Sequence, residues 1–593
     1  MLVSRIKEHF KMFRPYIIPF KGKFILILSL ILILALLSLA PPLFLKYLLD
    51  DVFIKKDFSA LYLVIGAFFI VQLLQSGIKV FMEYWHEYVG AWMIFKIRND
   101  LFRHLQSLSV NFFQSTKHGD ILTRLRGDVA SIHAIISIVL TSTLPDFTQI
   151  VGILCILFYL NWGLTLMSLV MIPLFFFSLS FFGKKIKFMA RQSRDKDARI
   201  TNLFMEVINN ISVVKIFNTQ EYELSRHEKR STDYINTTLK MHKIKFVSVF
   251  VIGMVTTISI LIVLGFGGYF VMTDSLTIGG FVAFYTYMIR LFGPLQRVAN
   301  YNVSIYSCLA SVERVKELLE LSPEIVDIPE PIELKNVKGK ISFSDVIFNH
   351  PNKSNTGKEN YILQNISFEI NPGEHIAIVG KTGAGKTTII NLLCRLYHPQ
   401  QGTIKIDDID IKNVSETSLY KNISIVPQND MLFNESVEEN IRYGNNAGSD
   451  SSIQNYIKAI GLDIIIGKME NRIKTNIGPQ GSRLSGGERK ILMIARALIK
   501  NTSIIIFDEA TSAIDMKSEE MIFKNLGYLM KDKTVITIAH RYSSIINADK
   551  VLVLDQGKIA GIGTHAELLK DNHTYQVLFN ESFGKKDKQL SYA

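Results

Sequence analysis

The chain has 593 residues, of which 48% are hydrophobic and 20% are charged, and its formal net charge is +13. This length exceeds a single domain, and the apolar content excludes an ordinary soluble protein. Because the apolar residues concentrate before roughly residue 310, we interpret the positive charge mainly as membrane topology and expect no nucleic-acid binding.

The first 22 residues differ from the apolar stretch that follows them. Residues 1–20 mix Lys, Arg and His with Phe, Ile and Met, which is typical of an amphipathic helix on the inner membrane surface. Pro15 and Pro19 fit a bend before the first span. We therefore assign residues 1–22 to an amphipathic elbow helix.

Six apolar stretches follow within residues 23–321, each long enough to cross a bilayer, which takes about 20 residues. They are residues 24–45, 61–82, 135–160, 162–182, 246–272 and 278–295. One such stretch can be a buried core helix, but six in succession leave no soluble core to fill. No proline lies between Pro42 and Pro145, or between Pro173 and Pro294, so uninterrupted helices can extend past the bilayer into the cytoplasm.

The distribution of Lys and Arg predicts the orientation of the spans. The segments after spans two and four are rich in basic residues, including Lys96, Arg98, Lys184 and Lys185, whereas the opposite loops are short and mixed in charge. Positive charge marks the cytoplasmic side. We expect a multi-pass protein, in the inner membrane if bacterial, with both termini in the cytoplasm and with polar turns at 111–119 and 218–226 far from the bilayer.

Polar side chains inside the spans are costly in lipid and are therefore candidates for a substrate cavity. The candidates are Lys79, Glu83, Asp146 and Arg290, and Gln149 and Arg297 are also noticeable. Arg290 lies about 12 residues into the last span, or roughly 18 Å by helical rise, whereas snorkelling explains Arg297 near the interface. A cationic Arg290 in an apolar cavity favours an amphipathic substrate with an anionic head, such as a lipid.

A proline-containing linker, residues 322–339, leads to a second domain at 340–578, and we expect a flexible tail at 579–593. Residues 380–387 match the phosphate-binding loop pattern between an apolar strand and a helix. Its backbone N–H groups surround phosphates, Lys386 reaches the terminal phosphates, and the Thr387 hydroxyl can bind Mg²⁺. The residues expected to bind ATP are Gly380, Lys381, Thr382, Gly383, Ala384, Gly385, Lys386, Thr387 and Thr388.

Further strands end in residues that suit phosphate hydrolysis. Asp508 and Glu509 follow a buried-strand pattern, and two adjacent carboxylates require a cation or a proton. Behind a phosphate-binding loop, Asp508 is expected to hold Mg²⁺ through water and Glu509 to deprotonate the attacking water. Gln428 is expected to sense the metal and the water, and His540 to donate to the γ-phosphate.

A third motif opens the helix pattern at 489–500. Leu484 precedes Ser485, Gly486, Gly487 and Glu488. Unpaired N–H groups at a helix N-terminus favour an anion, although an ordinary helix cap has similar residues.

With these motifs in this order, the chain resembles the ATP-binding-cassette family, and within it the fused half-transporters of bacterial lipid-flippase and multidrug exporters. The resemblance implies an all-α six-helix transmembrane domain followed by an α/β P-loop ATPase cassette, with ATP hydrolysis driving export by alternating access. It implies that Ser485, Gly486, Gly487 and Glu488 contact ATP held by a partner subunit, and that His540 is the switch histidine. One phosphate loop and one signature then require a dimer.

Three positions depart from the family pattern. Glu488 stands where the signature usually has Gln, and Pro479 replaces the usual glutamate in the loop 475–481 that touches the membrane domain. His350 stands where an aromatic residue, usually Tyr, stacks on adenine, and imidazole stacks more weakly. None of these changes removes a catalytic group.

The leading interpretation is a homodimeric exporter of a hydrophobic or amphipathic substrate, a lipid or a drug, with ATP and Mg²⁺ as its cofactors and membrane lipids around it. The alternatives are one half of a heterodimer, a peptide exporter, an importer built on the exporter fold, and an ATP-gated channel or regulator. Mass and ATPase measurements separate the dimer types, vesicle uptake detects import, and ion current exceeding turnover identifies a channel.

Overall fold

The structure is a computed structural model of the whole chain. It describes residues 13–324, 327–349, 361–445, 454, 456–458, 460–509, 527, 529–539 and 541–582. Contacts within the chain define two units. The first comprises Met1–Gln106 and His118–Leu321, and the second comprises Ser107–Lys117 and Ser322–Ala593.

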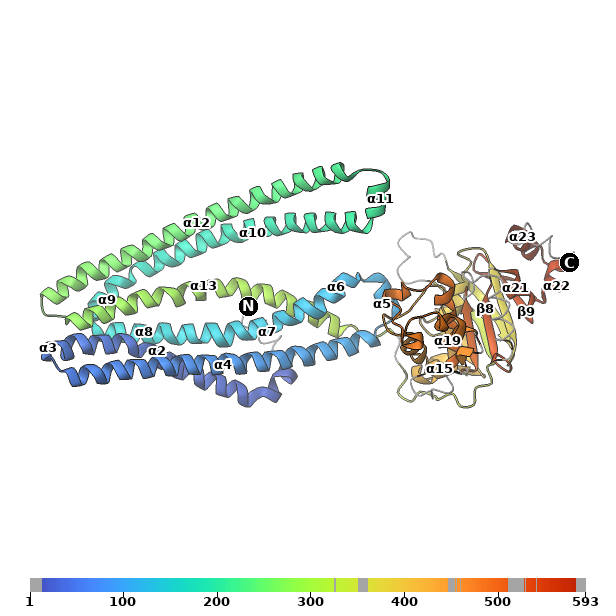
Figure 1. Cartoon of the computed structure of the whole chain (residues 1–593), viewed down its shortest axis with the longest axis horizontal. Coiled ribbons are helices and arrows are strands. Elements are labelled where there is room, and N and C mark those ends of the chain that lie inside the picture. The colour runs from blue at the N-terminus through green and yellow to red at the C-terminus, as the bar shows by residue number, and fades with distance from the viewer. Residues whose placement is uncertain are drawn as a thin grey trace. The chain divides into compact units, whose positions relative to one another are not determined.

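The first unit is all-helical (Figure 1). Six helical segments among the described residues are long and apolar enough to cross a membrane. The long helices are α2 (Lys21–Tyr47), α4 (Phe58–Ser107), α8 (Leu144–Leu160), α9 (Trp162–Leu169), α10 (Met171–Asn209), α12 (Gln220–Met272) and α13 (Ile278–Glu320). Short elements join them: α3 (Phe53–Lys55), α6 (His118–Thr123), η3 (Arg124–Asp128), α7 (Val129–Ser137), η4 (Ile138–Thr143) and α11 (Ile211–Ile216). The expected six-helix transmembrane fold is confirmed.

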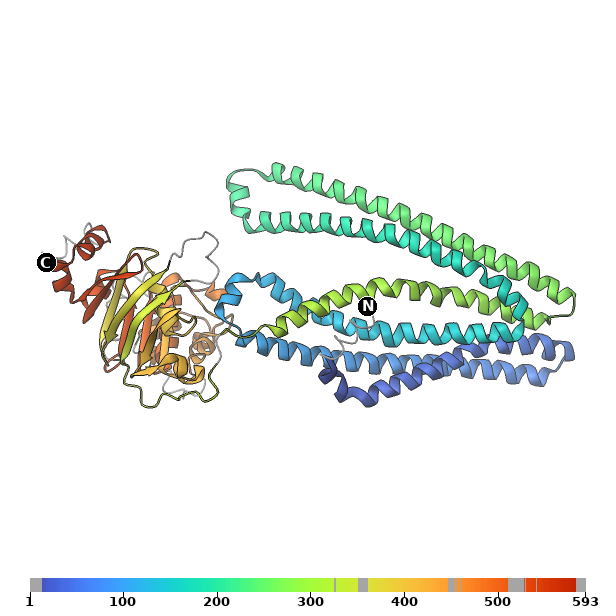
Figure 2. The ribbon, with the colours of Figure 1, turned by 180° about the vertical axis from the view of Figure 1, so that it is seen from behind.

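Helix α13 forms the centre of this unit's apolar core. Its buried Phe284, Tyr287 and Leu291 pack in one cluster with Ile153 and Leu157 of α8. Helices α10 and α12 run side by side as a long hairpin closed by α11 (Figures 1 and 2). Both carry many exposed apolar side chains, which is the pattern of helices that face lipid or another subunit.

The second unit contains two β-sheets, which confirms the expected α/β cassette fold. The larger has the strand order β10-β9-β3-β8-β7-β6, and its strands from β9 to β6 are parallel. The smaller, antiparallel sheet has the order β2-β1-β4-β5. The strands are β1 (Ile341–Phe348), β2 (Leu363–Ile370), β3 (His375–Gly380), β4 (Gln401–Ile406), β5 (Ile409–Asp410), β6 (Ile423–Val426), β7 (Ile504–Asp508), β8 (Thr534–Ile538), β9 (Lys550–Asp555) and β10 (Lys558–Gly563).

Helices pack against the larger sheet. The main ones are α14 (Lys386–Leu393), α15 (Glu416–Asn422), α16 (Val437–Arg442), α18 (Leu462–Gly467), α19 (Gly486–Ile499), α21 (Tyr542–Ile546), α22 (His565–Asp571) and α23 (His573–Ser582). Strands β3, β6, β7 and β8 are buried and point their carboxyl ends toward the same edge. In parallel α/β sheets this edge is where ligands bind.

A short helix from the N-terminal half belongs to the second unit. Helix α5 (Val110–Ser115) lies in the segment Ser107–Lys117. The Tyr397 hydroxyl donates to Gln114 Oε1 at 2.9 Å, and Asn111 donates to Glu324 at 3.1 Å. Phe112 and Phe113 form an edge-to-face pair. The second polar turn lies in the first unit, where Phe217 is exposed.

Candidate functional site

The phosphate-binding loop connects β3 to α14 through glycines that no other residue replaces easily. Gly385 has φ +102°, a left-handed conformation, and a Cβ there would lie 2.6 Å from Leu363 Cδ2. A Cβ on Gly380 would lie 2.4 Å from the Leu554 carbonyl oxygen. The loop therefore keeps its backbone close to β9 and leaves the N–H groups at the start of α14 free to meet an anion.

The Lys386 side chain lies within the phosphate-binding loop. Its buried Nζ donates to the carbonyls of Gly380 at 2.7 Å and Lys381 at 3.2 Å. Burial lowers the pKa of this ammonium, while Glu509 and Asp508 oppose that shift. Thr387 is exposed at the first turn, whereas Thr388 is buried. The lysine can exchange two carbonyl acceptors for phosphate oxygens without changing its place in the loop.

Asp508 and Glu509 differ in environment although they are adjacent. Asp508 is buried at the end of β7, and its Oδ1 has no hydrogen-bond partner among the described residues. Burial, followed by repulsion from Glu509, raises the pKa of Asp508 to about 6. A buried carboxylate with an unsatisfied oxygen is a group that a cation stabilises.

Glu509 turns away from the strand in a conformation that is rare for its residue type. Its φ of +51° places it in the left-handed region, which costs free energy for a residue with a Cβ. Gln428 donates from Nε2 to Glu509 Oε2 at 2.8 Å. The structure thus brings together the expected base and the expected sensor residue from neighbouring strands β7 and β6.

Two basic residues of α19 hold the Gln428 segment, and sequence reasoning missed both. Buried Lys490 donates to the carbonyls of Pro427 and Gln428. Arg489 donates to Asp430 at 2.6 Å. The sequence feature that could have revealed Lys490 is a lysine beside the apolar residues of α19, since a buried amino group needs nearby acceptors. The helix that carries the signature also positions the residue beside Glu509.

The signature residues form a capping box at the start of α19. Ser485 Oγ accepts from the Glu488 N–H at 3.3 Å, and Glu488 Oε2 accepts from the Ser485 N–H at 2.8 Å. Gly486 and Gly487 are partly exposed in the first turn. Glu488 is therefore compatible with this helix start, because glutamate and glutamine fill the same capping position.

Other expected residues lie outside this constellation. His350 and His540 lie outside the described residues. Pro479 begins a short 3-10 helix (Pro479–Gly481) in which Gln480 has φ +51°. The sequence-predicted residues that the structure brings together are those of the loop, Gln428, Asp508 and Glu509.

The family description "ABC transporter transmembrane region" matches residues 24–295, and "ABC transporter" matches residues 363–512. An "ATP-dependent lipid A-core flippase" of Desulfotalea psychrophila is 35% identical over 97% of this chain and 99% of its own length. The chain belongs to the ABC transporter family.

Two further relatives agree along nearly the whole length of the transporter. The "putative multidrug export ATP-binding/permease protein YgaD" of Bacillus subtilis is 30% identical over 96% of this chain and 98% of its own. The solved structure of a bacterial Atm1-family ABC exporter with ATP bound superposes with a TM-score of 0.80 at 26% identity, covering 96% and 99% of the two chains. The transporter is a multi-pass membrane protein that couples ATP hydrolysis to export.

The charged candidates of the transmembrane unit do not share one environment. Buried Asp146 accepts from the Arg297 guanidinium at 2.6–3.1 Å and also from the Tyr301 hydroxyl at 2.5 Å. Lys79 and Glu83 face each other at 3.8 Å on the exposed surface of α4. Arg290 is exposed and donates to the Ser38 carbonyl at 3.2 Å. Two of the four candidates are thus paired with each other, and Asp146 is paired with Arg297.

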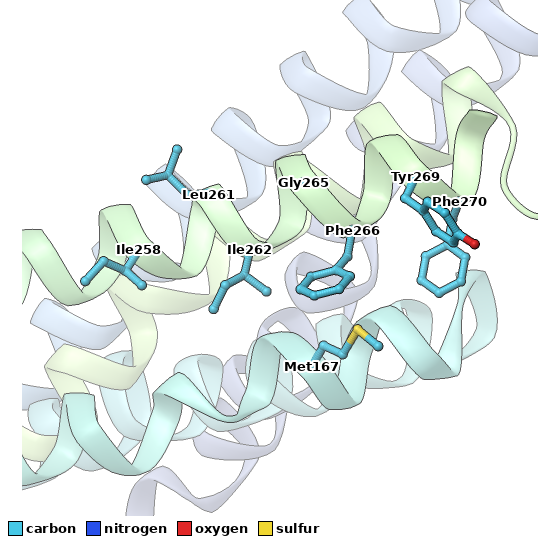
Figure 3. Close-up of a pocket in the computed structure, with 8 residues that line it drawn as sticks. All are labelled: Met167, Ile258, Leu261, Ile262, Gly265, Phe266, Tyr269 and Phe270. Carbon is cyan, nitrogen blue, oxygen red and sulfur yellow. The ribbon is translucent and has the colours of Figure 1, made fainter. Parts of the chain in front are cut away.

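A separate apolar cavity of about 620 Å³ lies between α9 and α12 (Figure 3). Its lining consists of Met167, Ile258, Leu261, Ile262, Gly265, Phe266, Tyr269 and Phe270. None of the four charged candidates lines this cavity. Its walls suit a hydrocarbon chain, and they offer hardly any hydrogen-bonding group to a polar substrate.

Proposed function

We propose that this transporter is a homodimer that moves an amphipathic lipid with an anionic head across a bacterial inner membrane by alternating access. The observation that carries the lipid assignment is Arg290. Its side chain is exposed within an apolar span, and it makes no ion pair among the described residues. An unbalanced charge inside a membrane is expensive and therefore favours a counter-ion on the substrate.

The contrast with Arg297 on the same helix supports this assignment. Arg297 lies two turns further along α13 and donates from Nε and Nη2 to the Asp146 carboxylate. Arg290 donates one hydrogen bond to a backbone carbonyl, and the rest of its guanidinium remains available for a phosphate or carboxylate. Relatives named as lipid flippases point to the same substrate class.

The dimer follows from the number of motifs and from the placement of the signature. The chain has one phosphate-binding loop and one signature. Ser485 sits at the N-cap of α19, and its exposed N–H neighbours can bind an anion that another cassette presents. We infer that two copies enclose two ATP molecules, each between the loop of one chain and the signature of the other.

The described residues also fit Mg²⁺, which such a site uses with ATP. The exposed Thr387 hydroxyl, the unsatisfied Asp508 carboxylate and Gln428 offer the oxygen ligands that Mg²⁺ prefers, directly or through water. When bound, the ion neutralises phosphate charge. Lys386 then binds terminal phosphate oxygens, while Glu509, oriented by Gln428, takes the proton of the attacking water.

The decisive experiment is an ATPase screen of the purified transporter in nanodiscs with anionic, zwitterionic and uncharged lipids and with cationic drugs. We expect anionic lipids to stimulate hydrolysis most, and Arg290→Gln to reduce the ratio of stimulated to basal rate. Arg191→Gln, which removes an exposed arginine of α10, is the matched control.

Two outcomes would overturn parts of this proposal. Stimulation by cationic or uncharged drugs alone would remove the anionic lipid as substrate. An inactive monomer, seen by mass measurement of the protein expressed alone, would replace the homodimer with one half of a heterodimer.

A further inference from the structure

Three side chains of metal-ligand type converge where α4 meets α7. His86 and Glu87 lie on α4, and His133 lies on α7. One ligand atom from each residue lies within 4.8 Å of the other two. The two imidazole rings stack with centroids 4.9 Å apart, and His86 Nδ1 is 3.6 Å from Glu87 Oε1. We propose that these residues bind a divalent transition-metal ion, with Zn²⁺ as the best match.

Unsatisfied nitrogens are the first evidence for a missing ligand. His86 Nε2 and His133 Nε2 are both buried, and neither has a hydrogen-bond partner among the described residues. Buried polar atoms are almost always paired, so two orphans on stacked rings point to a ligand that satisfies the pair. No part of the ATP-driven cycle described above uses either histidine.

A glycine provides the second, independent observation. Gly90 lies one turn beyond His86 on α4, and a Cβ at this position would lie 1.9 Å from His133 Nε2. Only glycine therefore lets the His133 ring lie directly against α4 beside His86. The backbone is shaped to admit this imidazole between the two helices.

Exposure gives the site an entrance. The His86 side chain is 6% exposed, whereas that of Glu87 is 74% exposed. The site lies just beyond residue 82, where the second span was expected to end, and just before residue 135, where the third was expected to begin. An ion can thus reach the carboxylate from the membrane boundary and then bind the two buried nitrogens.

The donor set selects the class of ion. Two imidazoles and one carboxylate suit Zn²⁺, which binds three protein ligands and keeps a fourth position for water in open sites. Ca²⁺ and Mg²⁺ prefer oxygen ligands and are disfavoured here. Tetrahedral Zn²⁺ with bonds of about 2.0–2.1 Å needs ligand atoms closer than those seen here, so binding must rotate the His86, Glu87 and His133 side chains until their ligand atoms converge.

The ion would therefore link two helices that share few other contacts. Arg98 of α4 donates to the carbonyls of Leu125 and Arg126 in η3 at 3.2 and 3.3 Å. A metal bridge between His86 and His133 would add a second link, three turns along α4. We expect bound Zn²⁺ to raise the thermal stability of the transmembrane unit, because the ion binds the folded pair and not the unfolded chain.

The test uses the full-length chain without an affinity tag, stripped with a chelator in lipid nanodiscs. After incubation with ZnCl₂ and removal of free ion, elemental analysis should give one Zn²⁺ per chain, retained in excess Mg²⁺. Replacement by Co²⁺ should give the visible absorption of a tetrahedral site. His133→Gln, Glu87→Gln and Gly90→Ala should each lower the affinity at least tenfold, whereas His118→Gln, at an exposed histidine of α6, should not.

The variants keep the proposal falsifiable even if one fails to fold. Gly90→Ala keeps all three ligand residues in the chain and acts by displacing the His133 ring. Glu87→Gln changes an exposed side chain, so its effect on packing is small. Wild-type protein that retains no Zn²⁺, or Zn²⁺ retained equally by wild type, His133→Gln and Glu87→Gln, would overturn the site.

Discussion

Buried carboxylates have charged partners in the transmembrane unit, whereas a buried carboxylate of the cassette has an oxygen without a hydrogen-bond partner among the described residues. In the transmembrane unit, Asp146 is held by the Arg297 guanidinium, and Asp128 is held by Arg314 through both of its oxygens. In the cassette, Asp508 is equally buried, but its Oδ1 has no hydrogen-bond partner among the described residues and its pKa is raised to about 6. A buried carboxylate that is paired with arginine fixes a contact between helices, whereas a buried carboxylate oxygen without a donor can bind a ligand.

The largest expected effect tests the cassette side of this comparison. Glu509→Gln removes the proposed base while leaving the phosphate-binding loop unchanged. We expect the hydrolysis rate to fall about 10²- to 10⁴-fold, as for loss of a general base, with ATP binding preserved. Phosphate release and nucleotide titration of the same sample measure the two quantities.

Two further variants serve as comparisons for Glu509→Gln. Lys386→Ala should weaken ATP binding itself, because it removes a donor to the phosphates. Glu470→Gln, at an exposed position of the cassette, should change neither quantity. Near-normal turnover in Glu509→Gln would show that another group takes the proton.

The next effect tests the transmembrane side. Among the described residues, Arg297→Ala leaves the buried Asp146 with the Tyr301 hydroxyl as its one hydrogen-bond partner. Arg297 is itself 54% exposed in its side chain, so we expect a loss of about 2 kcal/mol, below that of a fully buried pair. Thermal unfolding of the full chain in nanodiscs measures this loss.

A double variant separates charge from packing. Arg297→Gln with Asp146→Asn removes both charges and should recover part of the lost stability, since no ion is then left unpaired. If the single and double variants were as stable as the wild type, Asp146 would be free to serve the substrate instead of the fold.

A smaller effect concerns Glu488, where the signature carries a charge. Glu488 accepts from the Ser485 N–H, and glutamine can make the same bond. Glu488→Gln keeps the cap but removes a negative charge beside the expected γ-phosphate. Charges at a helix terminus are worth about 0.3–1 kcal/mol, so the apparent ATP affinity should rise about two- to five-fold.

The dependence of hydrolysis on ATP concentration measures this shift. Glu488→Ala is the informative contrast, because it removes both the charge and the capping bond. An unchanged or weaker affinity in Glu488→Gln would place the signature away from the phosphate, or would favour a partner chain with a different signature.

Much of the cassette site could be predicted because Gln428, Asp508 and Glu509 lie at or just beyond the ends of strands that the sequence reveals. Gln428, Asp508 and Glu509 needed only the rule that parallel strands end at one edge. Lys490 was missed because its acceptors are backbone carbonyls, which carry no signal in the sequence. Asp146 was predicted as a cavity residue because its partner lies 151 positions away on another helix.

The same limit explains the metal-ligand cluster in the transmembrane unit. His86 and His133 are unremarkable in the sequence, since nothing local brings α4 and α7 together. Their approach depends on Gly90, a single small residue in a helix of 50. Which distant helices pair depends on how their side chains pack together, and this packing cannot be predicted from the sequence of either helix alone.

The smallest effect concerns His375, a half-buried histidine of the cassette whose two ring nitrogens both have hydrogen-bond partners. His375 opens β3, with Nε2 2.9 Å from Thr537 Oγ1 and Nδ1 3.2 Å from the Asn547 carbonyl. Burial lowers its pKa below the usual 6.5.

As pH falls below 6.5, the unfolded chain therefore takes up a proton before the folded one, and the free energy of unfolding decreases by at most about 1.4 kcal/mol per pH unit. Unfolding followed between about pH 5 and pH 8 should show a shallower slope in His375→Gln than in wild type, whereas His573→Gln, at an exposed histidine of α23, should keep the wild-type slope. Equal slopes in all three proteins would mean that His375 takes up its proton in the folded state as readily as in the unfolded chain.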